Sequence, residues 1–224
     1  MMPLPAETAL LIIDMQRDFC DPGGYAAHAG IDVALLRAPI ARIVALREQA
    51  RRLGMMVIYT REGHRADGSD CHPQKRRRAQ TAGAAIGSAG PLGRLLIRGE
   101  HGHDMVDELQ PAPGEPVVDK PGYGAFYQTD LELLLRSGGI RNLVLTGVTT
   151  DVCVHSTLRE AVDRGYACTT VADGCAAGDP QLHAAALRMI AGEGNIFGQV
   201  RSAAELLDEW RMLAAASSGA HGAG

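Results

Sequence analysis

A cysteine lies where a predicted strand is followed directly by a helix, and such a position favours a reactive thiol. The apolar run NLVL (142–145) predicts a buried strand. Apolar residues then recur at helical spacing up to Gly165, namely Val154, Leu158, Ala161 and Val162. Cys153 is thus expected near the free N–H groups of a first helical turn, which stabilise a thiolate and can hold an oxyanion. The alternative is a small, buried, unreactive side chain.

Charged residues end two other predicted strands and could complete the chemistry of this thiol. A nucleophilic cysteine needs a group that accepts its proton and a positive charge that favours the thiolate. Asp14 ends the run ALLIID, and Lys120 ends the run PVVDK. They supply both roles if their strands lie beside the strand that leads to Cys153, because an ammonium and a helix N-terminus can lower the pKa of a thiol by about two units. Taken singly, Asp14 could cap a turn and Lys120 could be solvated.

Short apolar runs alternate with helical patterns along the chain, and this order predicts the fold. Strands are expected at residues 9–14, 55–60, 116–120, 142–145, 167–173 and 195–200. Helices are expected at residues 40–53, 129–137, 154–165, 179–192 and 202–210. The alternation predicts an α/β protein whose sheet of about six mainly parallel strands carries helices on both faces. Ligands of such sheets bind beyond the carboxyl ends of the strands, where the charged residues and the cysteine are expected.

Composition excludes several classes of protein. The chain has 224 residues, of which 46% are hydrophobic and 21% charged, and a net charge of −4. These values are typical of a globular protein and give no electrostatic case for a nucleic-acid or membrane partner. We see no signal peptide and no apolar run of the ~18 residues that a membrane span needs. Five cysteines without a C-x-x-C pair argue against disulfides and a zinc site. We expect a cytoplasmic protein without a metal or other cofactor.

Two segments do not follow the α/β pattern. Residues 61–99 are polar and rich in glycine, without a periodic apolar face, so we expect a long functional loop that forms a lid or contacts another subunit. Its basic run KRRR (75–78) is expected to be a solvated patch or to meet a neighbouring subunit. Residues 213–224 are small and polar, which predicts a disordered tail. Residues 1–212 are expected to form a single domain.

Three stretches together resemble one enzyme family. ALLIIDMQRDFC, DKPGYGAF and TGVTTDVCVHSTLREAVDRGY are similar, in that order and spacing, to motifs of the isochorismatase-like cysteine hydrolases, and the similarity covers about residues 8–210. The resemblance implies a Rossmann-like three-layer α/β sandwich and a catalytic triad of Asp14, Lys120 and Cys153. It also implies a cis peptide bond between Val148 and Thr149, which would aim the N–H groups of Thr149 and Cys153 at an oxyanion.

Within the family, the chain looks most like biuret hydrolase and its triuret-cleaving relatives. The resemblance rests on YTREGHRADGSD, on the stretch from KRRR to LIRGE, and on GNIFGQV. It implies a cysteine-dependent amidohydrolase that releases ammonia from the terminal C–N bond of a small urea such as biuret or triuret. The candidates for binding the substrate are Arg61, Glu62, Tyr123, Glu193 and Gln199. A glutamate at 193, where the resemblance suggests glutamine, leaves room for a longer urea. The family also suggests a homo-oligomer, often a tetramer.

Other functions remain open. Family members also act on N-carbamoyl amino acids, ureidoacrylate and nicotinamide. A nicotinamidase would need a metal site, and the stretch TREGHRADGSDCH has histidines but no aspartate directly after the strand. A non-catalytic binding protein with an inert Cys153 is the alternative from another class, since fold does not determine function.

Overall fold

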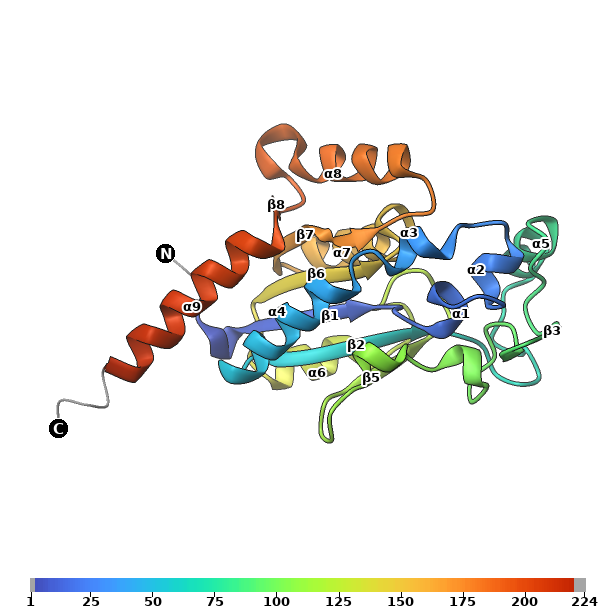
Figure 1. The fold of residues 1–224 in the computed structure, drawn as a ribbon, viewed down its shortest axis with the longest axis horizontal. Coiled ribbons are helices and arrows are strands. Elements are labelled where there is room, and N and C mark those ends of the chain that lie inside the picture. The colour runs from blue at the N-terminus through green and yellow to red at the C-terminus, as the bar shows by residue number, and fades with distance from the viewer. Residues whose placement is uncertain (1–2, 220–224) are drawn as a thin grey trace.

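The computed structural model describes residues 3–219, and their core is one parallel sheet of six strands (Figure 1). In chain order the strands are β1 (Thr8–Ile13), β2 (Met56–Glu62), β5 (Val117–Lys120), β6 (Asn142–Val148), β7 (Ala167–Ala176) and β8 (Gln199–Arg201). Their order across the sheet is β5-β2-β1-β6-β7-β8. Numbered within this sheet alone, that order is 3-2-1-4-5-6, the Rossmann-like arrangement. The predicted α/β fold is therefore confirmed.

Helices cover both faces of the sheet because β1 is apolar on both sides. Leu10 and Ile12 pack with α4 (Ile40–Arg52) and α9 (Ala203–Gly219) on one face. Leu11 and Ile13 pack on the other face with α6 (Leu131–Ser137), α7 (His155–Asp163) and α8 (Pro180–Asn195). All six residues of β1 are buried, as expected for a central parallel strand. The short helices α1 (Arg17–Cys20), α2 (Tyr25–His28) and α3 (Val33–Arg37) follow β1.

The segment 61–99 is more ordered than its composition predicts. It contains helix α5 (Pro73–Thr81) and a two-stranded hairpin, β3 (Ala89–Gly90) and β4 (Gly93–Arg94). A short apolar run that follows the hairpin, Leu95, Leu96 and Ile97, is buried. In Figure 1, α5 and the hairpin lie beside α1 and α2, at the carboxyl ends of β1 and β2. The segment is thus placed to border a site at this edge of the sheet.

The predicted disordered tail, residues 213–224, overlaps the last helix of the structure. Helix α9 continues to Gly219, and Leu213 packs against the core on the sheet face that α9 covers. The segment LAAA that follows Met212 has high helix propensity and extends a helix that is already anchored by the buried Trp210. Residues 220–224 lie outside the described part of the chain.

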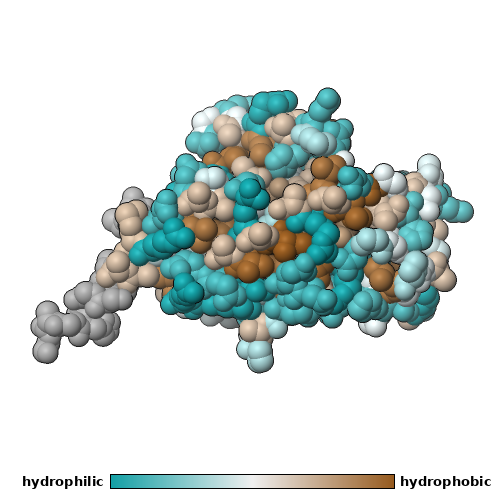
Figure 2. Space-filling model, in the orientation of Figure 1, coloured by the Kyte–Doolittle hydropathy of each residue, from teal (hydrophilic) through white to brown (hydrophobic). Residues whose placement is uncertain are grey.

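The surface is mixed, and within residues 3–219 no helix is long and apolar enough to cross a membrane. Figure 2 shows apolar residues gathered around α3 and α4 and beneath α8, between larger hydrophilic areas. Helix α8 also carries exposed apolar side chains, at Leu182 and Met189, and Ile196 follows it. The expected homo-oligomer remains a prediction, for which this helix supplies an uncovered apolar face.

Candidate active site

The three residues proposed as a triad meet at the carboxyl edge of the sheet. Asp14 follows β1, Lys120 ends β5, and Cys153 lies in the π-helical turn η4 (Thr150–Val154) between β6 and α7. The Lys120 Nζ atom lies 2.8 Å from Asp14 Oδ2, and both side chains are fully buried. One carboxylate oxygen of Asp14, one of Glu62 and the sulfur of Cys153 all lie within 4.8 Å of one another. The cluster lies at the carboxyl ends of β1 and β6, the two strands between which the strand order reverses and where ligands of such sheets bind.

The condition that both strands lie beside the strand leading to Cys153 is met for Asp14 but not for Lys120. Strand β1 does lie beside β6, but β5 is the edge strand on the far side of β2. Adjacent strands are ~4.8 Å apart, so Lys120 reaches Asp14 across β2 only because its side chain is long. Glu62, at the end of β2, is paired in register with Lys120, and its strand lies between those of Lys120 and Asp14. The acidic residue of the middle strand is therefore part of the site.

Burial makes Asp14 a stronger base than a solvated aspartate. Its backbone has φ 52°, an uncommon left-handed conformation for a residue with a side chain. Thr60 donates its hydroxyl to Asp14 Oδ1 at 2.6 Å. Burial raises the pKa of Asp14, and Glu62 raises it further, while Lys120 and Thr60 oppose the rise. A carboxylate with a raised pKa can both accept and return a proton near neutral pH, as predicted for this residue.

Glu62 differs from Asp14 in its protonation and in its contacts. Its Oε1 lies 2.6 Å from Lys75 Nζ, and its Oε2 lies 3.4 Å from Lys120 Nζ. The Cys153 thiol donates to Glu62 Oε2 at 3.2 Å. Burial would raise the pKa of Glu62, but the two lysines outweigh it and lower the value to about 2. Glu62 is thus ionised at any physiological pH and is a weak base.

The resting nucleophile is a thiol, not the thiolate that the sequence suggested. Burial raises the pKa of Cys153 well above its usual value, and Lys120 lowers it by less than burial raises it. The cysteine does lie at the start of a helix, but its sulfur also faces two carboxylates, Asp14 and Glu62, and their charges oppose ionisation of the thiol. A nucleophilic role for Cys153 would therefore require its proton to pass to Asp14 during the attack.

Activity should fall on the acid side as Asp14 is protonated. Asp14 must be ionised to accept the thiol proton, and its raised pKa moves the loss of activity above the pH of about 3.9 where solvated aspartate titrates. Glu62 cannot produce this change, since its pKa is about 2. The check is kcat/KM measured from about pH 4 to pH 8, with circular dichroism as the control for folding. Undiminished activity at the lowest pH, from folded protein, would contradict the role of Asp14.

The peptide bond between Val148 and Thr149, just before the nucleophile's turn, is cis, as the resemblance implied. Val152 and Val154 donate their N–H groups to the Thr149 carbonyl, at 3.2 and 3.1 Å, and so close the turn. The oxyanion role of the Thr149 and Cys153 N–H groups stays a prediction.

Gly147 allows β6 to approach β1 at this point. Its φ is +110°, and an added Cβ would lie 2.0 Å from the Ile13 carbonyl oxygen, in the strand that positions Asp14. We expect Gly147→Ala to lower the free energy of unfolding by about 3 kcal/mol or more, through backbone strain and overpacking. Gly192→Ala is the matched control, because its Cβ would meet nothing within 4 Å. Urea unfolding of both variants tests this, and equal stability would refute the steric requirement.

The structure adds three residues to the site that the sequence did not single out. Lys75 contacts Glu62, although its neighbours in the KRRR run are exposed. Gln16 donates to the Glu62 carbonyl at 3.0 Å and accepts from the Glu62 N–H at 2.7 Å, so it fixes the end of β2. Tyr25 lies near Glu62, because burial and then the charge of Glu62 raise the pKa of Tyr25 to about 12. Lys75 had no clear sequence signal, because it lies in a basic run that is typical of a solvated surface and its helix α5 has Ala79 as its one buried residue.

The predicted substrate contacts divide into two groups. Glu62 lies in the site, and so does Tyr123, whose carbonyl accepts from Lys120 Nζ at 2.9 Å. Arg61 does not face it: successive strand residues point to opposite faces, and the Arg61 side chain pairs with Asp119 at 2.8 Å.

Glu193 and Gln199 lie toward the amino ends of the strands, whereas the site lies at their carboxyl ends. Their prediction as substrate contacts is therefore not supported. Helix α8 leaves the carboxyl end of β7 and runs back toward the amino ends of the strands. The helical part of α8 ends before a kink at Gly192, Glu193 and Gly194, and its length of roughly 18 Å carries Glu193 and Gln199 away from Cys153. Glu193 is exposed. Gln199 pairs with Thr169 near the start of β7.

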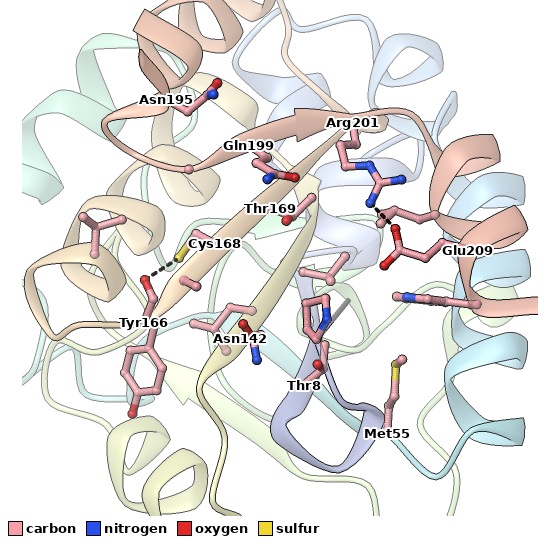
Figure 3. A pocket seen from close by; sticks show the side chains of 18 of the residues that line it. Thr8, Met55, Asn142, Tyr166, Cys168, Thr169, Asn195, Gln199, Arg201 and Glu209 are labelled. Atoms are coloured by element: carbon pink, nitrogen blue, oxygen red, sulfur yellow. Dashed lines mark hydrogen bonds and ion pairs between the residues drawn. The ribbon is translucent and has the colours of Figure 1, made fainter. Parts of the chain in front are cut away.

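A cavity of about 700 Å³ lies at this opposite edge, and Figure 3 shows its lining. It is bordered by the amino ends of β1, β6 and β7 and by β8 and α9. Two polar pairs in its lining are bonded within the protein: Arg201 to Glu209, and the Cys168 thiol to the Tyr166 carbonyl. A ligand in this cavity would lie far from Cys153. We therefore place the active site at the cluster of Asp14, Glu62, Lys120 and Cys153 at the opposite ends of the strands.

The cluster could be considered as a metal site, but its charges do not favour one. Asp14, Glu62 and Cys153 offer ligand atoms within 4.8 Å of one another, the one such group among the described residues. Lys120 and Lys75 already neutralise the two carboxylates. A divalent cation would have to bind between two ammonium groups and a protonated thiol, and like charges at this distance repel strongly. The expected absence of a metal remains a prediction.

Comparison with known proteins shows which family the chain resembles. The family model described as "Isochorismatase domain" matches residues 8–205. The chain is 40% identical over 169 residues to the ureidoacrylate amidohydrolase RutB of Pantoea ananatis (strain LMG 20103). That match covers 70% of this chain and 64% of the relative, less than two thirds of its length.

Two solved structures extend the comparison. A cysteine hydrolase from Pseudomonas syringae pv. phaseolicola 1448A is similar with a TM-score of 0.78 and 28% identity, over 94% of this chain and 98% of that one. The N-carbamoylsarcosine amidase of Thermoplasma acidophilum is similar with a TM-score of 0.67 and 26% identity, over 88% and 96% of the two chains.

Proposed function

Because the chain belongs to the isochorismatase family, we propose that it is a cysteine-dependent amidohydrolase that cleaves the terminal C–N bond of a small ureido compound. The observation that supports this most is the buried Cys153 thiol beside an aspartate–lysine pair, at the switch point of the sheet. The similar proteins support the type of bond, since two of them are named for the hydrolysis of ureido or carbamoyl compounds.

The first half of the reaction forms a covalent intermediate. Asp14 accepts the Cys153 proton while the sulfur attacks the carbonyl carbon of R–NH–CO–NH₂. Lys120 balances the charge of Asp14 and of the developing thiolate. The oxyanion lies toward the N–H groups of Thr149 and Cys153. Asp14 then returns the proton to the departing nitrogen, so that ammonia leaves and R–NH–CO–S–Cys153 remains.

The second half regenerates the thiol. A water molecule gives a proton to Asp14 and attacks the thioester, and collapse of the intermediate returns that proton to sulfur. The products are R–NH–COOH and the free enzyme; biuret would give allophanate. Asp14, rather than Glu62, serves as the base in both steps, because its pKa is raised whereas that of Glu62 is about 2.

The substrate is proposed as a class, with biuret and triuret as the first members to test. The glutamate at 193 gives no reason to prefer triuret, because Glu193 lies far from the nucleophile. Ureidoacrylate and N-carbamoyl amino acids share the terminal carbamoyl group, and the names of similar proteins favour including them.

Ammonia release from a panel tests the proposal. The panel contains biuret, triuret, ureidoacrylate, an N-carbamoyl amino acid and nicotinamide, each measured with and without a chelator. We expect turnover of one or more ureido compounds, unchanged by the chelator. Chelator-sensitive turnover of nicotinamide would instead assign a metal-assisted nicotinamidase, and no turnover of any compound by folded protein would favour a non-catalytic binding protein.

A further inference from the structure

A second carboxylate touches the nucleophile, and the reaction described above gives it no task. Glu62 is 3% exposed, and its Oε2 lies 3.2 Å from the Cys153 sulfur. Its backbone is held on both sides by Gln16 and its side chain by Lys75. Lys75 and Lys120 pair with its charge, and its Oε2 also accepts a hydrogen bond from the Cys153 thiol. When the thiol gives up its proton during attack, Oε2 loses this donor and can accept a hydrogen bond from the substrate instead.

A urea offers a group that other amides lack. Its carbonyl carbon carries two nitrogens: one leaves as ammonia with a proton from Asp14, and the other stays on the product and keeps its N–H. We infer that Glu62 accepts the hydrogen bond of this retained N–H, and that Lys75 is the positioning residue that holds Glu62 for it. The inference rests on the proposed ureido hydrolase function and narrows its substrates to ureas whose retained nitrogen carries a hydrogen atom.

The geometry supports this contact. During attack the sulfur comes within ~3–3.5 Å of the carbonyl carbon, and each nitrogen is bonded directly to that carbon. An acceptor 3.2 Å from the sulfur is therefore within hydrogen-bond reach of one of these nitrogens. Asp14 is tied to Lys120 and Thr60 in the same cluster. Both carboxylates thus lie close to the nucleophile, with one ligand atom each of Asp14, Glu62 and Cys153 within 4.8 Å of the others.

The charge of Glu62 makes the contact selective. As an ionised carboxylate it can only accept hydrogen bonds. A carbamate ester with oxygen in place of the retained N–H would bring two acceptors together. An N-methyl urea would place a methyl group against the carboxylate and leave it unpaired. Sites built to bond one polar group reject analogues that lack it by large factors.

Lys75 holds Glu62 from the side away from the sulfur. Its Nζ binds Glu62 Oε1 at 2.6 Å, donates to the Pro121 carbonyl at 2.7 Å and lies 4.9 Å from the centre of the Tyr123 ring. Oε2 is left to face Cys153 and Lys120. Through α5, the segment 61–99 therefore completes the site of its own chain.

The wild-type enzyme gives the first test, with three matched substrates. They are the best ureido compound of the panel, its analogue methylated on the retained nitrogen, and the carbamate ester with oxygen at that position. We expect kcat/KM for the parent to exceed that of each analogue by about 100-fold or more. Analogues hydrolysed as fast as the parent would overturn the inference and leave the proposed function intact. No turnover of any ureido compound would instead refute the proposed function itself.

Variants then assign the selectivity to residues. Glu62→Ala should reduce the ratio of parent to N-methyl analogue to within about 3-fold, and Glu62→Gln, which keeps an acceptor oxygen, should give an intermediate ratio. Lys75→Met should lower the ratio and raise KM more than it lowers kcat. Arg77→Gln is the matched control, because it also removes a positive charge from α5 but at an exposed position.

The ratio of kcat/KM for the parent substrate to kcat/KM for the N-methyl analogue distinguishes substrate recognition by Glu62 from a structural role. A variant that is merely destabilised slows both substrates equally, so an unchanged ratio in Glu62→Ala would overturn the inference. If Glu62→Ala fails to fold, the ratio in Glu62→Gln and the wild-type substrate series decide in the same way.

Discussion

Replacing Cys153 by alanine is expected to lower kcat/KM for the ureido substrate by about 10⁴-fold or more, because the covalent route is lost. The fold should change little, since the side chain is small and the residue's backbone turn is set by Gly147 and the Thr149 carbonyl. Steady-state ammonia release and urea unfolding of the same preparation measure the two effects separately.

Cys168→Ala is the matched control for this variant. Cys168 is also buried, but it lines the cavity at the opposite edge of the sheet. Its replacement should leave kcat/KM within about 3-fold of wild type and cost about 1 kcal/mol of stability at most. Equal activity losses in the two variants would show that the reaction does not depend on the thiol of Cys153 in particular.

Replacing Lys120 by methionine is expected to abolish activity and also to destabilise the fold by about 3–5 kcal/mol. Methionine has a similar length but no charge, so Asp14 and Glu62 would remain buried next to each other without the ammonium between them. Lys120 also donates to the carbonyls of Gly122 and Tyr123, which fix the loop after β5. The free energy of unfolding from urea titration measures this loss.

The destabilisation of Lys120→Met should depend on pH in a defined direction. Without the ammonium, the folded-state pKa of Asp14 rises further above its unfolded value, so folding favours the protonated acid. The stability deficit should therefore shrink as the pH falls and grow as it rises. The double variant Lys120→Met/Asp14→Asn should recover part of the loss at neutral pH. A deficit that is independent of pH would contradict the opposed roles of these buried charges.

The reacting residues were predictable from sequence because of one topological rule. In a parallel sheet, residues that end strands share an edge. Asp14 and Lys120 end apolar runs and Cys153 follows one, which predicts that all three lie at one edge, whereas the triad itself was implied by the family resemblance. The sequence did not show that β2 lies between β1 and β5, and so it did not place Glu62 at the centre of the cluster.

The remaining site residues depended on features that hydrophobic periodicity does not carry. Lys75 lies on α5, a short helix with Ala79 as its one buried residue, within a basic run that is typical of a solvated surface. Glu193 and Gln199 were misplaced because the length and direction of α8, rather than their local motif, decide which edge they reach. The thiol's protonation also required the structure, since burial outweighs the nearby lysine.

The most direct test of the central claim is the mass of the enzyme during turnover. The wild-type protein is mixed with its best ureido substrate, quenched in acid within the first turnovers and analysed by intact and peptide mass spectrometry. We predict an adduct equal to the substrate less one ammonia, located on the peptide that contains Cys153 and absent from Cys153→Ala. An adduct on another residue, or turnover by Cys153→Ala at the wild-type rate, would contradict covalent catalysis by this thiol.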